Sequence, residues 1–116
     1  MNDTRLVLQR HLERFAARDL DGLLADYADD SVLFTPEGAL QGRGAIRALM
    51  SRLCAEFAKP GARFQLDVLT VAGDVGYIVW SAETADNRYE FATDTFVVCG
   101  GKIAQQSFAA RVVPRS

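Results

Sequence analysis

Apolar residues recur at two different spacings along the chain, and the spacing changes once, near residue 60. Up to Phe57 they recur every three or four residues, which is the period of amphipathic helices. From residue 63 onward, stretches rich in β-branched and aromatic side chains show the two-residue period of β-strands. The pattern predicts helices followed by an antiparallel sheet, an α+β layout in a single domain over residues 1–116.

Three helices are expected in the first half of the chain. On the first of them, the only histidine, His11, falls on an apolar stripe between Val7 and Phe15 at four-residue spacing. We therefore expect this helix to bury its imidazole. The expected elements are helices over residues 4–18, 19–27 and 42–59, a short strand over 32–35 and at most a brief extended piece at 40–41.

Four long strands are expected in the second half of the chain. They are joined by short connections of hairpin type, so the sheet should be an antiparallel meander. These strands have apolar residues on both faces. Because one face packs on the helices, the other needs a cover, most simply a second copy of the protein, and we predict a homodimer through the outer face of the sheet. The strands cover residues 63–72, 75–85, 88–99 and 103–113.

Composition and charge narrow the class of partner. The net charge of −2 gives no electrostatic basis for binding nucleic acid or an anionic membrane. Cys54 and Cys99 have no CxxC spacing, so we interpret them as buried thiols in a reducing compartment, with a disulfide as the alternative. One histidine is too few for a typical transition-metal site, and no cofactor is expected. Without a signal-peptide core or a run of transmembrane length, we expect a cytoplasmic protein.

The third long strand carries one carboxylate near its middle, Asp94. It shares its parity with the charged Glu90 and the apolar Phe96, and the opposite parity is mixed as well, so periodicity fits either face. An inward Asp94 would have a raised pKa or would need a partner such as His11 or Gln106. An outward Asp94 would be an ordinary solvated side chain.

Three segments, together with the order of elements, resemble the SnoaL-like branch of the nuclear-transport-factor-2-like superfamily. They are Arg-Asp-Leu-Asp-Gly-Leu-Leu at 18–24, Tyr-Ala-Asp-Asp-Ser-Val at 27–32 and Leu-Gln-Gly-Arg-Gly-Ala-Ile at 40–46. The resemblance covers essentially the whole chain. It implies a cone-shaped, strongly curved antiparallel sheet wrapped around three N-terminal helices, with a pocket inside. Family members include ketosteroid isomerases, polyketide cyclases, dehydratases and epoxide hydrolases, so the fold does not settle the activity.

The resemblance to the ketosteroid isomerases can be followed at three positions. Their tyrosine on the first helix falls at His11, their general-base aspartate at Thr35, and the neutral carboxylic acid of their oxyanion hole at Asp94. A threonine cannot abstract a proton from carbon, so steroid isomerisation is not expected. The dehydratases of the superfamily use histidine and aspartate in the same cavity, which keeps a His11–Asp94 pair compatible with another reaction.

The resemblance also turns Asp94 inward, and two hypotheses follow. In the first, Asp94 and His11 are the catalytic residues of an enzyme that isomerises, cyclises or dehydrates a hydrophobic small molecule bearing a carbonyl or hydroxyl group. In the second, the same cone is a non-catalytic module that binds a metabolite or dimerises. The residues expected to line the pocket are Tyr27, Phe34, Thr35, Phe57, Trp80, Phe96, Gln106 and Phe108.

Overall fold

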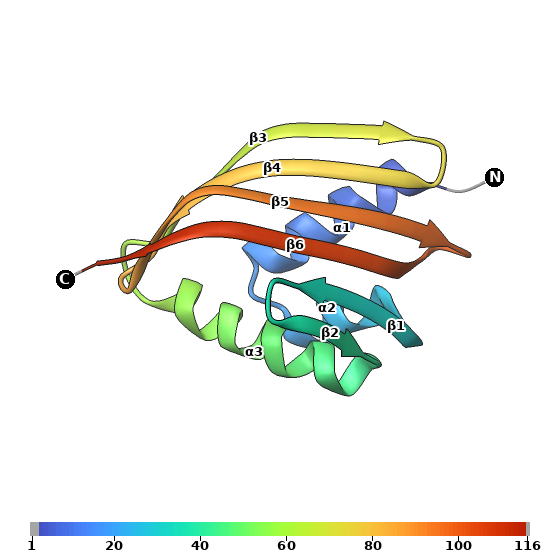
Figure 1. Cartoon of the computed structure of the whole chain (residues 1–116), viewed down its shortest axis with the longest axis horizontal. Coiled ribbons are helices and arrows are strands. Elements are labelled where there is room, and N and C mark those ends of the chain that lie inside the picture. The colour runs from blue at the N-terminus through green and yellow to red at the C-terminus, as the bar shows by residue number, and fades with distance from the viewer. Residues whose placement is uncertain (1–2, 116) are drawn as a thin grey trace.

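Three helices lie against the concave side of a curved six-stranded sheet (Figure 1). The computed structural model describes residues 3–115. The sheet is not closed, and the α+β layout expected from the spacing of apolar residues is confirmed. The elements are α1 (Thr4–Ala16), α2 (Leu20–Ala25), β1 (Tyr27–Thr35), β2 (Gly38–Gln41), α3 (Arg43–Ala58), β3 (Arg63–Ala72), β4 (Val75–Glu83), β5 (Asn87–Cys99) and β6 (Lys102–Pro114).

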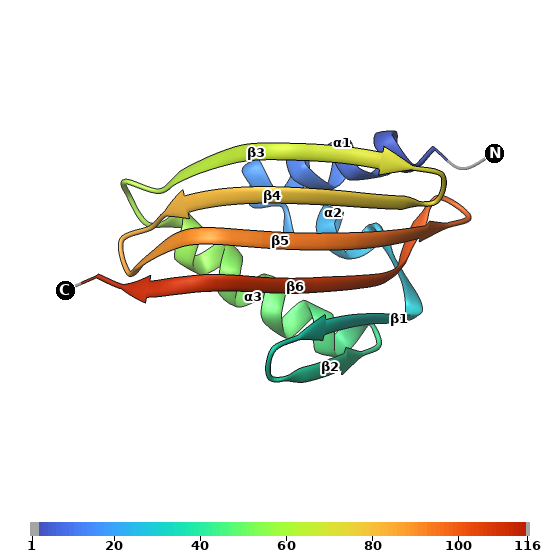
Figure 2. The ribbon, with the colours of Figure 1, turned by 45° about the horizontal axis from the view of Figure 1, so that its top comes forward.

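The four long strands form the expected antiparallel meander, from β3 to β6. Beyond it, β1 pairs with β6 in parallel, and β2 pairs with β1, so the strand order is β2-β1-β6-β5-β4-β3 (Figure 2). The sheet is therefore mixed at this edge, which the sequence pattern did not predict. A short strand carries no signal of its own for a partner at the other end of the chain.

The second helix ends earlier than predicted, and the strand after it begins earlier. α2 stops at Ala25, and Tyr27 opens β1 although its spacing also fits the helix face. The backbone explains the change: the amide of Ile103 on β6 donates to the carbonyl of Asp26 at 2.7 Å, and Tyr27 pairs with Ile103. Strand pairing with a distant segment thus overrides the local helical spacing.

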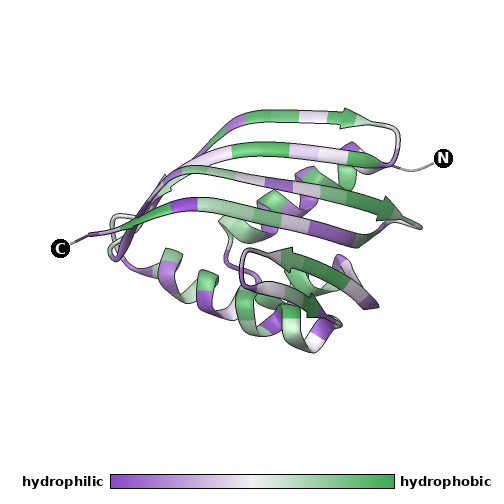
Figure 3. Ribbon diagram, viewed as in Figure 1, coloured by the Kyte–Doolittle hydropathy of each residue, from purple (hydrophilic) through white to green (hydrophobic). Residues whose placement is uncertain are grey.

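Alternation along the long strands turns one set of side chains toward the helices, and Figure 3 shows apolar and polar residues alternating along the ribbon. Trp80, which the resemblance places in the pocket, is buried on β4 together with Ile78 and Ala82, which share its parity. Gln106 on β6 is buried in the same layer. The core therefore lies between the inner face of the sheet and the helices.

The parity expected for β5 is confirmed in its second half and is wrong in its first. Asp94 and Phe96 are buried, whereas Glu90 is exposed and Tyr89 is buried in its place. The register against β6 shifts between Tyr89 and Phe91. Such a β-bulge adds one residue to a strand and changes which side chains face inward.

The two cysteines were both expected to be buried thiols, and this is confirmed for one of them. Both cysteines are free thiols, and Cys54 is buried on α3 as expected. Cys99 is exposed, because it is the last residue of β5 and lies beside the turn into β6. Within residues 3–115, no helix is long and apolar enough to span a membrane.

Helix α1 packs against β4 at Gly76, where a side chain has no room. A Cβ atom at this position would lie 2.3 Å from Cδ2 of Leu8, which is itself buried. We expect Gly76→Ala to lower the free energy of unfolding by about 1–3 kcal/mol, the usual cost of overpacking a core, measured by urea denaturation.

Gly44→Ala is the matched control, because a Cβ at Gly44, in the first turn of α3, meets nothing within 4 Å. Alanine also favours a helix by about 1 kcal/mol over glycine. Equal unfolding midpoints for Gly76→Ala and Gly44→Ala would contradict the close packing of α1 on β4.

Candidate functional site

A small cavity lies between the helices and the inner face of the sheet. Its volume is about 60 Å³, well below the roughly 300–1,000 Å³ of a typical ligand site. The walls are mostly apolar, and three polar side chains reach them: His11 from α1, Asp94 from β5 and Gln106 from β6. Convergence of a few polar groups on an apolar cavity is the usual form of a small-molecule site.

Most of the residues expected from the sequence to form the site do line this cavity, and three do not. Tyr27 lies behind the wall and contacts His11. Phe34 is 47% exposed, and the Thr35 hydroxyl donates to the carbonyl of Gly38 in the following turn. The residues that reach the cavity are His11, Phe57, Trp80, Asp94, Phe96, Gln106 and Phe108.

The parity of β1 explains why Phe34 lies outside the cavity wall, whereas Thr35 shares the parity of Leu33 but is the last residue of the strand, beside the turn. Leu33 is fully buried and lines the cavity, so the next side chain along the strand points away from it. Further wall residues come from faces of α1 and α3 whose helical spacing indicates burial. Core residues and cavity residues have the same spacing, so the sequence could not show which of them line the cavity. These wall residues are Leu12, Phe15, Leu49, Met50 and Leu53.

Asp94 is a buried carboxyl group with both oxygens engaged. Trp80 Nε1 donates to Oδ1 at 2.8 Å, and Gln106 Nε2 donates to Oδ2 at 2.8 Å. Burial raises the pKa of Asp94 to about 6, although these two hydrogen bonds and the charge of His11 act to lower it. Asp94 can therefore be either a carboxylic acid or a carboxylate near neutral pH, as a general acid or base requires.

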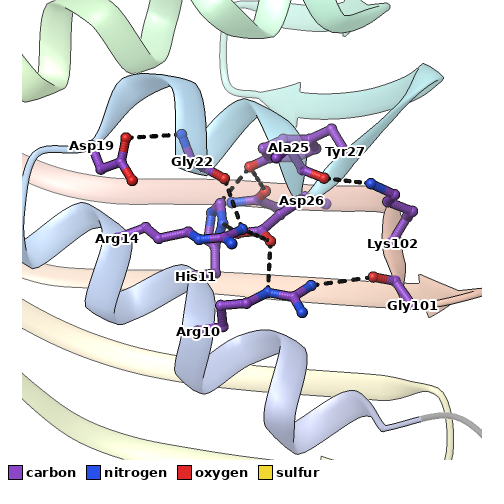
Figure 4. A network of polar contacts seen from close by, with 11 residues as sticks. Arg10, His11, Arg14, Asp19, Gly22, Ala25, Asp26, Tyr27, Gly101 and Lys102 are labelled. Atoms are coloured by element: carbon purple, nitrogen blue, oxygen red, sulfur yellow. Dashed lines mark hydrogen bonds and ion pairs between the residues drawn. The ribbon is translucent and has the colours of Figure 1, made fainter.

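A second buried carboxylate, Asp26, follows α2, and nothing in the sequence pattern distinguishes it from a solvated acid (Figure 4). Arg10 Nε and Arg14 Nη1 donate to its Oδ1 at 3.0 and 2.6 Å, and His11 Nδ1 donates to its Oδ2 at 2.8 Å. Burial raises the pKa of Asp26, but the hydrogen bonds and charges of His11 and the two arginines outweigh it, and the net shift is downward. Asp26 is thus a fixed negative charge behind the imidazole.

Tyr27 and Gln106 connect the two carboxylates through His11. The Tyr27 hydroxyl lies 3.3 Å from His11 Nε2 and donates to Gln106 Oε1 at 2.5 Å. Burial, with the charges of both carboxylates, holds the pKa of Tyr27 well above its usual range, so the hydroxyl keeps its proton. The buried chain of hydrogen bonds runs Asp26–His11–Tyr27–Gln106–Asp94–Trp80.

The chain of hydrogen bonds fits two arrangements that hold the same number of protons. In the first, Tyr27 donates to Gln106 Oε1 and accepts from His11 Nε2, so the imidazole carries two protons and Asp94 is a carboxylate. In the second, the Gln106 amide is turned over, Tyr27 donates to a neutral His11, and a protonated Asp94 donates to Gln106 Oε1. Exchange between the two moves charge between His11 and Asp94 without changing the net charge of the interior.

Proton transfer and hydrogen bonding are the chemistry that these groups offer. The Cys54 thiol is a poor nucleophile, because burial raises its pKa and disfavours the thiolate. Within the described part of the chain, no three His, Cys, Asp or Glu side chains gather closely enough to hold a metal ion.

The raised pKa of Asp94 predicts a contribution to stability that falls as the pH rises. The folded-state value of about 6 exceeds the ordinary value of 3.8, so the folded protein binds this proton more tightly than the unfolded chain does. The contribution of Asp94 to the free energy of unfolding is full below about pH 4 and declines up to about pH 6, by about 3 kcal/mol in total.

We expect the difference in free energy of unfolding between the wild type and Asp94→Asn to fall by about 3 kcal/mol between about pH 4 and pH 6. Urea denaturation across this range measures it. Subtracting the variant removes the opposite contribution of Asp26, whose lowered pKa adds stability as the pH rises. A difference that stays constant with pH would show that Asp94 does not titrate in this window.

Solved structures share this fold. An NTF2-like protein of unknown function from Mesorhizobium loti superposes with a TM-score of 0.79 at 26% identity, over 93% of this chain and 90% of that one. A putative ketosteroid isomerase from Kribbella flavida gives 0.77 at 15%, over 97% and 81%. SalBIII, an epoxide hydrolase/cyclase-like enzyme in pyran ring formation in the polyether salinomycin, gives 0.80 at 13%, over 93% and 90%. For the last two, this likeness is one of fold alone.

The sequence itself gives a family assignment. None of the proteins of curated function matches it significantly. The family model for the SnoaL-like domain, however, matches residues 8–106, which is most of the chain. The protein therefore belongs to the SnoaL-like domain family.

Proposed function

We propose that the protein is an acid–base enzyme that acts on a small, hydrophobic, oxygenated molecule, with Asp94 as its catalytic acid and base. One observation carries the proposal: a buried carboxyl with a pKa of about 6 lies on the wall of an otherwise apolar cavity. The protonated form donates a hydrogen bond to a carbonyl or hydroxyl oxygen, and the carboxylate form accepts a proton. Isomerisation, cyclisation and dehydration all use these two steps, and none of them needs a cofactor.

His11 assists Asp94 in this proposal. Its ring lies on the cavity wall, and Tyr27 and Gln106 link it to Asp94, so it supplies or stores the proton that Asp94 exchanges. Asp26 is a positioning residue, because its hydrogen bond to Nδ1 fixes the orientation of the imidazole. The aromatic walls that hold the substrate are Phe57, Trp80, Phe96 and Phe108.

The size of the cavity limits the substrate. A volume of about 60 Å³ is too small for a steroid, and Thr35, at the general-base position of the ketosteroid isomerases, lies outside the cavity wall. The buried part of the substrate is therefore a short chain or a single ring. Met50 on α3 is a flexible side chain that can move to make room for a ring.

Cyclohexanone in D2O tests this proposal, because it is a single-ring ketone whose α-hydrogens exchange when an acid and a base assist. We expect the wild type to accelerate this exchange, followed by NMR, and Asp94→Asn to lose at least nine-tenths of the acceleration. Binding of the ketone should also raise the pKa of Asp94 above 6, because the protonated carboxyl donates to the carbonyl. The chemical shift of the exposed Asp29 carboxyl, which should not respond to the ketone, is the internal control.

The second candidate function is a non-catalytic binding module, which the absence of a base at Thr35 favours. The same experiment separates the two. Binding that shifts the Asp94 resonance without accelerating exchange would favour the binding module. Full exchange activity in Asp94→Asn, or an Asp94 pKa near 3.8 that no ketone moves, would remove Asp94 from any role in catalysis.

We also propose a cytoplasmic homodimer that pairs through the outer face of the sheet. Val68, Val75 and Tyr77 are each about two-fifths exposed, and the strand pairing puts them on the side opposite the buried Ile78. Exposed apolar side chains gathered on one face of a sheet are typical of an interface. The free thiols of Cys54 and Cys99 fit a reducing compartment.

We expect the wild type to sediment as a dimer of its 12.7 kDa chain, and Tyr77→Lys to sediment as a monomer with unchanged circular dichroism. A lysine on the outer face must lose its hydration if the interface forms. Arg52→Ala, on α3 at the opposite side of the sheet, should remain dimeric. A wild type that sediments only as a monomer at high concentration would exclude this interface.

A further inference from the structure

A second, outer hollow of about 150 Å³ lies beside the cavity, where the ends of α1 and α3 meet the start of β3. Four apolar side chains, from Leu12 and Phe15 on α1, Phe57 on α3 and Phe64 on β3, line both the cavity and this outer hollow. A ligand that fills the cavity can therefore continue outward along an apolar boundary.

Two arginines distinguish the outer hollow from the cavity. Arg18 and Arg63 line it, and no acidic side chain does. Arg10 and Arg14, which approach the interior from α1, are both held by Asp26. In contrast, among residues 3–115 neither Arg18 nor Arg63 has a side-chain hydrogen bond or an ion pair. Their guanidinium groups are free donors at the entrance to an apolar cavity.

The backbone at Arg18 is a second, independent observation. Its φ of 53° makes it the only non-glycine residue in the left-handed region within the described part of the chain. It follows Ala17, the residue that caps the end of α1, and the amide of Asp19 donates to the carbonyl of Arg14 at 2.8 Å. This is the position of a helix end that glycine normally occupies. Strained residues of this kind gather at functional sites, where the side chain has a use that glycine lacks.

We infer that the site binds a small carboxylic acid whose far end carries a carbonyl or hydroxyl group. The oxygen at the far end lies against Asp94, an apolar linker passes the four shared side chains, and the carboxylate binds Arg18 and Arg63. The planar guanidinium group matches a carboxylate with paired hydrogen bonds. This inference rests on the proposed function for the inner end of the ligand, and adds the chemical class of the outer end.

The linker is narrow. The ring centroids of Phe15 and Phe57 are 5.0 Å apart, and those of Phe15 and Phe64 are 6.3 Å apart, both in edge-to-face geometry. These are direct ring contacts, so the linker runs alongside the rings and not between them, which suits methylene groups better than a fused ring system. A straight-chain oxo acid therefore fits the two hollows better than a polycyclic one.

The test uses 4-oxopentanoate, 5-oxohexanoate and 7-oxooctanoate, each beside its uncharged amide. The indole N–H resonance of Trp80, the only tryptophan, reports binding next to Asp94. We expect at least one acid to bind the wild type tenfold or more tightly than its amide. Arg18→Gly and Arg63→Ala should each remove most of this preference and leave amide binding unchanged, and Arg52→Ala should change neither.

Arg18→Gly also separates binding from folding. Glycine relieves the left-handed strain, so the melting temperature should stay the same or rise while acid binding weakens. Equal binding of acid and amide by the wild type, unchanged acid binding in both arginine variants, or no binding of any of the six compounds would overturn the inference. Acid binding that is weakened by Asp94→Asn but unchanged in both arginine variants would overturn it and leave the proposed function standing. An acid preference that is lost in the arginine variants, with acid binding unchanged in Asp94→Asn, would count against the proposed function and leave only the carboxylate end of the inference standing.

Discussion

The buried carboxylate of Asp26 is the interaction on which the rest of the site depends. It binds Arg10, His11 and Arg14, all on α1, while its own backbone carbonyl is held by Ile103 on β6. It therefore fixes the first helix against the last strand. A charge buried this completely is tolerated only when partners of opposite charge surround it, and removal of the carboxylate would leave these three side chains without their common acceptor.

The two buried carboxylates differ because their neighbours differ. Asp26 is surrounded by cations, which lower its pKa despite burial, whereas the donors to Asp94 are the neutral groups of Trp80 and Gln106, which only partly offset burial. One carboxylate is thus a permanent charge and the other a group that can change its protonation. When the surroundings of two titratable groups push their pKa values apart in this way, the two groups commonly take different roles within one site.

Periodicity in the sequence predicted the layers of the fold, and strand parity predicted most cavity side chains once the resemblance to the SnoaL-like family had indicated which face is the inner one. It did not identify Asp26, since an acid near the end of a short helix resembles a solvated one until its partners on another helix are known. Tyr27 was misplaced because its helical spacing coincides with the start of a strand. Phe34 was predicted to line the cavity, which Leu33 lines instead, for a related reason: the strand parity depends on packing against a segment at the other end of the chain.

The parallel pairing of β1 with β6 has a consequence for how the chain can fold. β1 is made early in synthesis and its partner is the last strand, so the contact between them joins residues far apart in sequence. Contacts of such long range slow folding, because the chain entropy of closing the loop is lost before the contact forms. On the ribosome, the edge of β1 that pairs with β6 stays uncovered until β6 emerges. The hydrogen-bonded interior, which needs Gln106 from that strand, can only be completed after translation reaches it.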